Sequence, residues 1–377
     1  MDRNLRVHVF HLRLKISGFI RQYWRVSDSN RLFLRFSALL IVLPLTLFTT
    51  LFGTPSVCAL DQTTEYGFHF ASQFVTPSAQ QLALLHPQWM RYGLVVPYAM
   101  PTFPANIKTL LLFNNESVTV QAPLNSADVA AWRNYVDTGY IPELTRFLHV
   151  YPFSTAIEIW NEEDLCSGRS YCPKVPAAGY AYMIKRAAST IKSFNANIQV
   201  IMGGLGAGNP DYIRNVRNAD ASALKQVDAV GIHPYGQSPS GWCTSQCSGI
   251  LPFGDLTTAI HAYKEAGGLP VWITEVGANN PDKYWQGQYA QKVFLSAAQN
   301  NVGVVIWYDM RDSGNSHWGL IDKNNNLKPS GKAFVQVSKN TFVTTQLPLR
   351  AVRRGEPTKI RAGDSSIGRP CSRMVER

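Results

Sequence analysis

The feature that most constrains the fold of this chain is an alternation of short β-rich runs with helical segments between residues 61 and 340. The runs are nearly continuously apolar, as strands of a parallel sheet are when both of their faces are covered. There are eight of them: residues 66–70, 89–95, 108–113, 155–160, 198–203, 229–233, 271–275 and 302–308. Eight β/α units in strict order predict a single closed (β/α)₈ barrel, the TIM barrel, rather than an open doubly wound sheet.

The helical patterns between these runs differ in strength. Apolar residues recur at helical spacing from 129 to 140, after a cap region at residues 125–126. Gly139 and Pro142 predict a break before the next helical stretch, 143–148.

Two later helices, 177–194 and 284–300, have an equally clear period. The connection 97–106 is short and rich in proline, so a helix there is expected to be degraded or missing. Clusters of Pro, Cys and Gly make residues 235–254 a predicted long loop.

A glycine-rich stretch, 203–208, follows the fifth run and has the look of a phosphate-binding loop. It lacks the Lys-Ser/Thr pair of a P-loop, so a tight strand-to-helix turn is the preferred interpretation. No glycine-rich dinucleotide fingerprint follows the first run. No cofactor is therefore expected.

The net charge of +11 belongs to the two ends of the chain. Residues 1–59 hold 8 Lys/Arg and 2 Asp/Glu, and residues 342–377 hold 8 and 3, whereas the middle of the chain holds 20 of each sign. No basic stripe interleaved with aromatic residues lies between the ends, which argues against a nucleic-acid partner. The tail 342–377 is Arg-rich, poor in large apolar residues and without period, so we expect it to be disordered.

Residues 1–59 have the pattern of a targeting segment ahead of the barrel, which we assign to residues 60–341. A long basic stretch precedes the charge-free run 36–52, and a small-residue site follows at 57–59. Both a cleaved signal peptide and an uncleaved signal anchor fit this pattern, and in the second case residues 36–52 would hold the protein in a membrane. The positive-inside rule leaves the barrel outside in either case, so the expected location is extracytoplasmic, secreted or anchored to the outer face of the membrane.

Four of the six cysteines, Cys166, Cys172, Cys243 and Cys247, fall in the barrel region. An even number in an exported domain indicates two disulfides, and the simplest pairing joins each cysteine to its near neighbour, although the sequence leaves the connectivity open. A four-thiolate zinc site is the rival interpretation, but the spacings differ from the usual C-x₂-C pair. No metal site is therefore expected.

Two of the β-rich runs deliver a glutamate at their C-terminal ends. Glu162 follows Asn161 directly after the fourth run, and Glu275 ends the seventh. Functional residues of a β/α barrel project from these strand ends. A pair of carboxyl groups that flanks the scissile bond is the machinery of glycoside hydrolysis, so the pair predicts that reaction.

Four strand-end segments together resemble the retaining glycoside hydrolases of clan A, and within the clan families 39 and 5 in particular. They are Trp160-Asn161-Glu162, His233-Pro234-Tyr235, Thr274-Glu275 and Ile306-Trp307-Tyr308. The similarity covers most of residues 62–340, including a closing segment at 318–322 and the Lys328-Pro329 entry to the last helix. An Asn-Glu pair alone has little weight, whereas four matches in the right order are specific.

The resemblance implies a double-displacement mechanism. Glu162 would be the general acid/base, and Glu275 would be the nucleophile that forms a glycosyl-enzyme intermediate. The two carboxyl groups should then lie about 5 to 5.5 Å apart, the separation typical of enzymes that retain the anomeric configuration.

The resemblance also implies substrate-binding roles for residues around this pair. Asn161 would bind the 2-hydroxyl of the sugar, and Tyr235 and Arg91 would hold the nucleophile ionised and oriented. Trp307 would form an aromatic floor under the sugar, and His233 would complete the polar wall of the site.

The sequence departs from the clan in one place. Many relatives have a proline after the acid/base, where this chain has Glu163 and Asp164. We interpret both as loop residues that lead toward Cys166.

The sequence thus predicts a retaining glycosidase that cleaves β-linked oligo- or polysaccharides. A transglycosylase and a carbohydrate-binding pseudoenzyme on the same barrel are the alternatives, although a pseudoenzyme predicts loss of one glutamate and both are present. A metal-dependent hydrolase would need clustered histidines, and a Schiff-base aldolase would need a strand-end lysine; the sequence offers neither. Xyloside, glucan, mannan and exopolysaccharide enzymes share these strand ends, so the sugar stays open.

Overall fold

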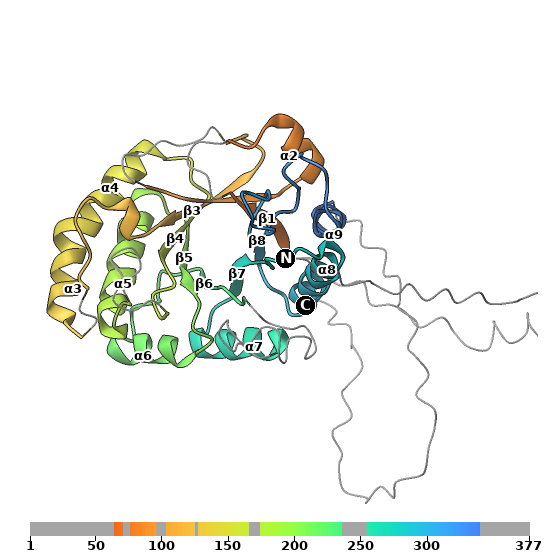
Figure 1. Cartoon of the computed structure of the whole chain (residues 1–377). Helices are drawn as coiled ribbons and strands as arrows, with labels where there is room; N and C mark the ends of the chain where they lie inside the picture. The colour runs from red at the N-terminus through yellow and green to blue at the C-terminus, as the bar shows by residue number, and fades with distance from the viewer. Residues whose placement is uncertain are drawn as a thin grey trace, which may run out of the picture. The chain divides into compact units, whose positions relative to one another are not determined.

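The computed structural model describes residues 64–70, 76–95, 103–124, 127–165, 174–235 and 255–339. Eight strands close into one barrel in chain order, and every described pairing is parallel (Figure 1). They are β1 Glu65–His69, β2 Trp89–Gly93, β3 Lys108–Phe113, β4 Ala156–Asn161, β5 Gln199–Leu205, β6 Ala229–Ile232, β7 Val271–Val276 and β8 Val304–Trp307. The predicted (β/α)₈ barrel is confirmed, and each strand lies within two residues of its predicted bounds.

Helices surround the strands (Figure 1). The described residues form α2 Ala79–Leu85, the 3₁₀ turn η2 Asn115–Ser117, α3 Val129–Tyr135, the π turn η3 Val136–Tyr140, α4 Ile141–Val150, α5 Ala177–Phe194, α6 Asp211–Ala219, α7 Leu256–Gly267, α8 Lys283–Gln299 and α9 Pro329–Ser338. The predicted helix 177–194 is confirmed to the residue, and the predicted helix 284–300 is α8. The last helix begins at Pro329, as the sequence indicated.

The break predicted at Gly139 and Pro142 is wrong. The helical chain runs from α3 through the π turn η3 into α4 without leaving helical geometry. Pro142 follows directly on the π turn, where the regular i→i−4 hydrogen-bond pattern is already interrupted. Gly139 is buried beside Val120, so its small size serves helix packing.

Toward the N-terminal ends of the strands, the barrel interior is filled by a plug of apolar side chains. It comprises Trp89, Leu110, Ala156, Ile201, Ala229, Trp272, Val304 and Ile306. The rings of Trp89 and Trp272 meet edge to face, with their centroids 5.1 Å apart. A side chain at Gly67 of β1 would collide with Trp89 and Ile306, so this glycine leaves room for the plug. The plug therefore separates the N-terminal ends of the strands, where Glu65 pairs with Lys108, from the space toward their C-terminal ends.

Several predictions concern residues outside the described ranges. These are the leader 1–59, the tail 342–377, nearly all of the predicted loop 235–254, and the candidate disulfide residues Cys166, Cys172, Cys243 and Cys247. Within the ranges that the structure describes, none of the helices has the length and apolarity that a membrane crossing requires.

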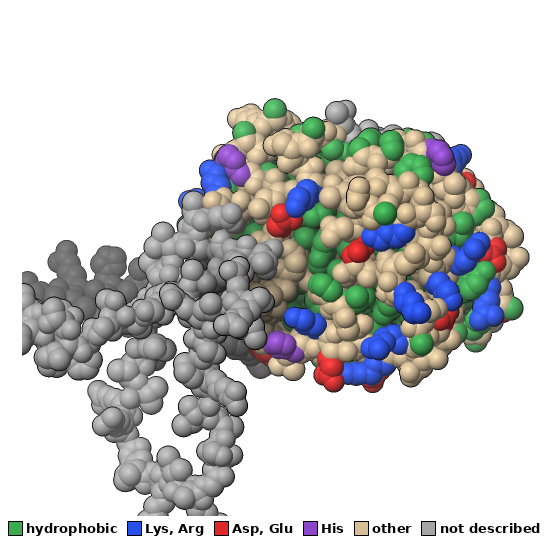
Figure 2. All heavy atoms as spheres, turned by 180° about the vertical axis from the view of Figure 1, so that it is seen from behind, with side chains coloured by type: hydrophobic (Ala, Val, Ile, Leu, Met, Phe, Trp, Pro, Cys, Tyr) green, Lys and Arg blue, Asp and Glu red, His purple; other side chains and the backbone are tan. Residues whose placement is uncertain are grey.

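The described surface carries charges of both signs. On the face drawn in Figure 2, Lys and Arg side chains are scattered among uncharged ones, with acidic side chains between them. This mixture agrees with the balanced charge count of the barrel region in the sequence.

Candidate active site

A layer of charged and polar side chains lies above the apolar plug. Six of the seven predicted site residues meet there: Arg91 from β2, Asn161 and Glu162 from the end of β4, His233 and Tyr235 from the segment after β6, and Glu275 from β7. Their side chains contact one another directly. The strand ends therefore converge on one site at the barrel mouth.

Arg91 is the centre of this layer and has no solvent exposure. Its Nε lies 2.6 Å from Oε2 of Glu158, and its Nη1 forms an ion pair with Oε1 of Glu275. Its Nη2 donates to Oδ1 of Asn161 at 3.1 Å. One guanidinium thus joins β2 to both glutamate-bearing strands, using the fixed fork of donors that only arginine offers.

His233 stands between the carboxyl groups. Its Nδ1 lies 3.1 Å from Oε1 of Glu162 and 3.9 Å from Oε2 of Glu275. On the other side of the ring, Nε2 lies 3.7 Å from Oε1 of Glu158. Oε1 of Glu162 and Oε2 of Glu275 therefore lie close together, because the distance between them cannot exceed the sum of their distances to Nδ1.

The two glutamates of the predicted pair differ in their surroundings. The hydroxyl of Tyr235 donates to Oε2 of Glu275 at 2.8 Å, in addition to the Arg91 ion pair. The Glu275 side chain is 13% exposed and that of Glu162 is 21% exposed. Glu275 therefore lies in the more enclosed and more strongly charge-balanced position.

Electrostatics follow from these contacts. Burial alone would raise the pKa of Glu275, but the positive charges of His233 and Arg91 outweigh it and lower that pKa to about 2. Burial alone would lower the pKa of His233, but the carboxylates of Glu275, Glu158 and Glu162 outweigh it and raise that pKa to about 10. These contacts favour the ionised form of Glu275 and the protonated form of His233.

Local irregularities in the strands aim the glutamates at the mouth. Side chains of a regular strand alternate between its two faces, yet both Ile159 and Trp160 pack in the outer core, and both Asn161 and Glu162 reach the site. Trp160 and Glu162 have left-handed backbone angles, φ 77° and 50°, which break the alternation. In β7 the register shifts between Ile273 and Val276, around Glu275. Such bulges re-aim side chains beside active sites.

The glycine-rich stretch makes room for the site. A Cβ on Gly204 would lie 1.9 Å from Nε2 of His233, and one on Gly206 would lie 3.2 Å from Cδ of Glu162. The predicted tight turn is wrong at its start, because Gly203 and Gly204 belong to β5 and α6 begins only at Asp211. The glycines therefore act by their lack of a side chain.

Trp307 is a correction to the predicted site. The side chain is fully buried and packs against Phe294 and Tyr289 of α8, with ring centroids 5.7 and 6.3 Å apart. Its Nε1 donates to the carbonyl of Trp318 at 2.9 Å. Because Ile306 belongs to the interior plug, strand alternation turns Trp307 outward, toward the helices.

An aromatic group that the sequence did not single out lies nearer the pair. Tyr308 stacks on His69, with centroids 5.0 Å apart and planes at 17°. Its ring also meets Tyr235 and Trp318 edge to face at 6.3 and 5.6 Å. Tyr308 is partly exposed, unlike Trp307, and so replaces it as the aromatic candidate.

Glu158 and His69 are the other residues that sequence reasoning missed. Glu158 is fully buried on β4; burial opposes its ionisation, but Arg91 lowers its pKa below the usual range. His69 lies 3.3 Å from Nη1 of Arg91 through its Nδ1, and burial lowers its pKa to about 3. A charged residue within an apolar strand and a histidine at a strand end were the available signals.

Glu163 and Asp164 lie in the turn after β4, as predicted, but both are buried rather than solvated. The Asp164 carboxylate accepts from the backbone N–H groups of Gly206 and Ala207 at 2.9 and 3.1 Å. The Glu163 side chain is fully buried, and burial, then the charge of Asp164, raises its pKa well above the usual range. Burial therefore favours the neutral form of the Glu163 carboxyl group.

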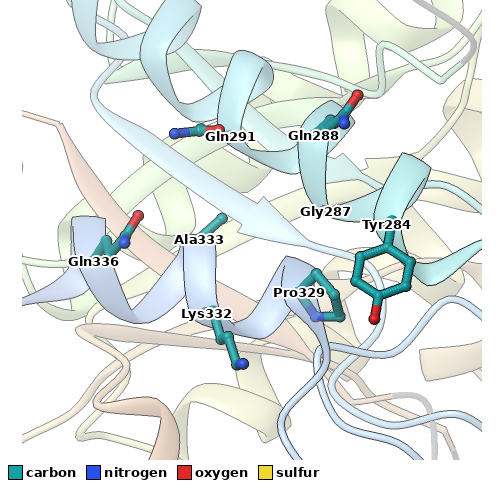
Figure 3. A pocket seen from close by; sticks show the side chains of 8 residues that line it. All are labelled: Tyr284, Gly287, Gln288, Gln291, Pro329, Lys332, Ala333 and Gln336. Atoms are coloured by element: carbon teal, nitrogen blue, oxygen red, sulfur yellow. The ribbon is translucent and has the colours of Figure 1, made fainter. Parts of the chain in front are cut away.

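One pocket away from the strand ends lacks this chemistry. A pocket of about 280 Å³ between α8 and α9 is lined by Tyr, Gln, Lys and small residues and contains no carboxylate (Figure 3). Among the residues that the structure describes, no group of three or more His, Cys, Asp or Glu side chains could hold a metal ion. The carboxyl pair is thus the candidate active site.

A closed barrel with a buried arginine between strand-end glutamates has the architecture of a glycoside hydrolase. The family model of the glycosyl hydrolase catalytic core matches residues 146–334, half of the chain. The protein belongs to this family and is a glycosidase, so its substrate is a carbohydrate. The resemblance to clan A glycoside hydrolases is confirmed at this level.

Solved structures share the fold at low sequence identity. The β-glycosidase BGL167 is 14% identical with a TM-score of 0.52, over 79% of this chain and 99% of that one. A family 30 endoxylanase from Clostridium papyrosolvens is 13% identical with a TM-score of 0.50, over 73% of this chain and 71% of that one. A search of curated proteins gave no match.

Proposed function

We propose that this glycosidase retains the anomeric configuration and cleaves β-linked oligo- or polysaccharides by double displacement, with Glu275 as nucleophile and Glu162 as acid/base. The observation that carries the proposal is the placement of both carboxyl groups on one imidazole nitrogen of His233, at 3.1 and 3.9 Å. That placement supports a close carboxyl pair of the retaining kind over the wider pair, roughly 6.5–9.5 Å apart, of inverting enzymes.

In the first step an oxygen of Glu275 attacks the anomeric carbon, and the bond from that carbon to the leaving oxygen breaks. Glu162 gives its proton to the leaving oxygen. In the second step Glu162 takes a proton from water, the hydroxide oxygen bonds to the anomeric carbon, and the ester bond to Glu275 breaks. Both carboxyl groups return to their starting protonation states.

Three neighbours prepare Glu275 for attack. The charges of Arg91 and His233 favour its ionised form, and the Tyr235 hydroxyl fixes one oxygen at 2.8 Å. Glu158 forms an ion pair with Nε of Arg91 at 2.6 Å. The guanidinium is thus held in position by a carboxylate that does not itself react. Because Arg91 shares its positive charge between Glu158 and Glu275, it orients the nucleophile without fully neutralising the charge of the Glu275 carboxylate.

Two further groups bind the sugar. Because Oδ1 of Asn161 faces Arg91 at 3.1 Å, its Nδ2 is left to donate to the 2-hydroxyl of the sugar. Such a bond strengthens as positive charge develops at the anomeric carbon. Tyr308, stacked on His69, offers the aromatic face that we expected from Trp307.

The leader and the cysteines are part of the proposal. Residues 1–59 direct export of the catalytic domain, 60–341, and the run 36–52 is either cleaved with the signal or retained as a membrane anchor. Local disulfides, Cys166 with Cys172 and Cys243 with Cys247, fit an extracytoplasmic location. Mass spectrometry of the mature protein tests cleavage, and non-reducing peptide mapping tests the pairs.

The stereochemical test uses the first-formed product. Wild-type protein is incubated with a panel of β-linked glucans, xylans and mannans, and the best substrate is followed by NMR before mutarotation. The β-anomer is expected first, and the α-anomer as first product overturns the double displacement. Size analysis of the fragments separates internal from terminal cleavage.

A further inference from the structure

A groove on the outer wall of the barrel has features of a binding site. It has a volume of about 280 Å³ and lies between α8 and α9 (Figure 3). Tyr284 stands at its rim with 67% of its area exposed, the largest value among the exposed large hydrophobic side chains of the described residues. The remaining lining residues are Gly287, Gln288, Gln291, Pro329, Lys332, Ala333 and Gln336.

One end of the groove lies on the same side of the barrel as the active site. In a β/α barrel each helix begins at the side where the preceding strand ends. Tyr284 is in the first turn of α8, which follows the Glu275 strand, and Pro329 is the first residue of α9, which follows β8. The groove therefore opens at the rim of the mouth, beside β7 and β8, and runs away from it along the helices.

The shape of the groove follows from small residues in its floor. A Cβ on Gly287 would lie 2.5 Å from Cβ of Pro329, so the two helices touch there. Gly287 and Ala333 are buried, whereas the glutamines and Lys332 line the walls and are exposed. An open channel with a closed floor results.

The chemistry of the lining suits a sugar chain. An exposed aromatic ring stacks on the C–H face of a pyranose, and primary amides can bond neighbouring hydroxyl groups. The lining contains no carboxylate and one cation. Nζ of Lys283 lies over the Tyr284 ring, 5.4 Å from its centroid, which leaves the opposite face of the ring for a sugar. A protein partner would call for an apolar centre, which these polar walls lack.

We propose that this groove binds a remote stretch of the same polysaccharide whose scissile bond lies between Glu162 and Glu275. The proposal rests on the proposed function for the identity of the polymer. A second contact on one chain raises the effective concentration of substrate at the active site without changing the chemistry. Its benefit should be confined to chains long enough to reach both places.

The test compares chain lengths in a Tyr284→Ala variant. The substrates are the polysaccharide that wild type cleaves fastest and a series of its oligomers. Tyr284→Ala should lower kcat/KM on the polymer by about two- to tenfold, the range expected for one aromatic contact, and leave the shortest oligomers unchanged. Gln288→Ala should show a smaller loss of the same pattern.

A matched control comes from the opposite end of the barrel. Phe153 is 58% exposed and lies just before β4, where the strands begin, far along the barrel from the mouth. Phe153→Ala should leave kcat/KM unchanged at every chain length. An equal loss at all lengths in Tyr284→Ala, or no loss on the polymer, overturns the proposal.

Binding without turnover separates this proposal from the proposed function. In a Glu275→Gln background, affinity electrophoresis in gels that contain the polymer should show weaker retardation once Tyr284→Ala is added. Unchanged retardation removes the groove from substrate binding and leaves the catalytic assignment intact. Full activity of Glu275→Gln would instead reject the catalytic assignment.

Discussion

The ends of β4 and β7 each present a glutamate to the same space, and their difference shows how position assigns chemistry. Glu275 belongs to its strand and contacts Arg91 and Tyr235. Glu162 comes one residue after its strand, with a left-handed backbone, and contacts His233. A nucleophile needs one fixed position, whereas an acid/base serves two steps. The rigid strand and the turn match those needs.

The largest effect should come from the β7 side. Glu275→Ala removes the atom that forms the covalent intermediate, so kcat should fall by roughly four orders of magnitude or more. Added azide should restore cleavage of an activated aryl glycoside by entering the vacated face, and NMR should show a glycosyl azide of inverted configuration. An azide product of retained configuration would assign the nucleophile elsewhere.

The β4 side should respond differently to the same substitution. Glu162→Ala should lower kcat on unactivated glycans by about 10²- to 10⁴-fold, the contribution typical of general acid/base catalysis. Aryl glycosides with good leaving groups should suffer much less in the first step, because they need no proton. With azide the product should retain its configuration, and inversion in this variant would exchange the two roles.

A smaller change sharpens the nucleophile side alone. Tyr235→Phe removes the hydrogen bond to Oε2 of Glu275, and a bond to a charged group contributes about 1.5–3 kcal/mol. We expect kcat/KM to fall by about 10- to 100-fold.

The same substitution should also move the pH profile. Since the Tyr235 bond lowers the pKa of Glu275, its loss should shift the acid limb of kcat/KM to higher pH. An unchanged acid limb would show that Tyr235 does not act on the ionisation of Glu275. Thermal unfolding of the variant controls for a loss of structure.

The smallest effect concerns stability and belongs to the β4 side. Glu163 has a raised pKa in the folded protein, so its contribution is most favourable below the unfolded pKa near 4.3 and is lost as pH rises. Glu163→Gln should match wild type at acid pH and be more stable at neutral and alkaline pH. The expected gain is roughly 2–4 °C in Tm for each kcal/mol relieved.

Thermal scans between acid and alkaline pH measure this difference. Glu116→Gln, at an exposed position, is the control and should show no such divergence. A variant curve parallel to that of wild type would mean that Glu163 is not held neutral.

The strands could be predicted from the sequence because their apolar runs are local features. The predicted pair also came from strand ends, which a barrel places on one face. Trp307 was predicted to face the barrel interior but faces the helices, because neighbouring residues of a strand point to opposite faces. Tyr308, the next residue, takes the place in the site that we predicted for Trp307.

The role of Glu158 could not be recognised from its own neighbourhood, where a charged residue within an apolar strand is the one local signal. Its importance depends on Arg91, which comes from a strand 67 residues earlier in the chain. The same holds for Gly204, whose missing side chain matters only because His233, just after the next strand, occupies that space. Such dependencies arise from packing between distant segments and leave no local pattern.

The Arg91 network has a consequence for how this enzyme could evolve or be re-engineered. Its charged members, Glu158 and Glu275, are anchored on strands, together with Arg91 itself. Loop segments that do not include Glu162, His233 or Tyr235 could therefore be exchanged or lengthened while Arg91, Glu158 and Glu275 stay in place. Graft libraries at the barrel mouth should yield variants with new glycan preferences more readily than libraries at the strand positions. Substrate specificity and catalytic chemistry can in this sense change independently within one molecule.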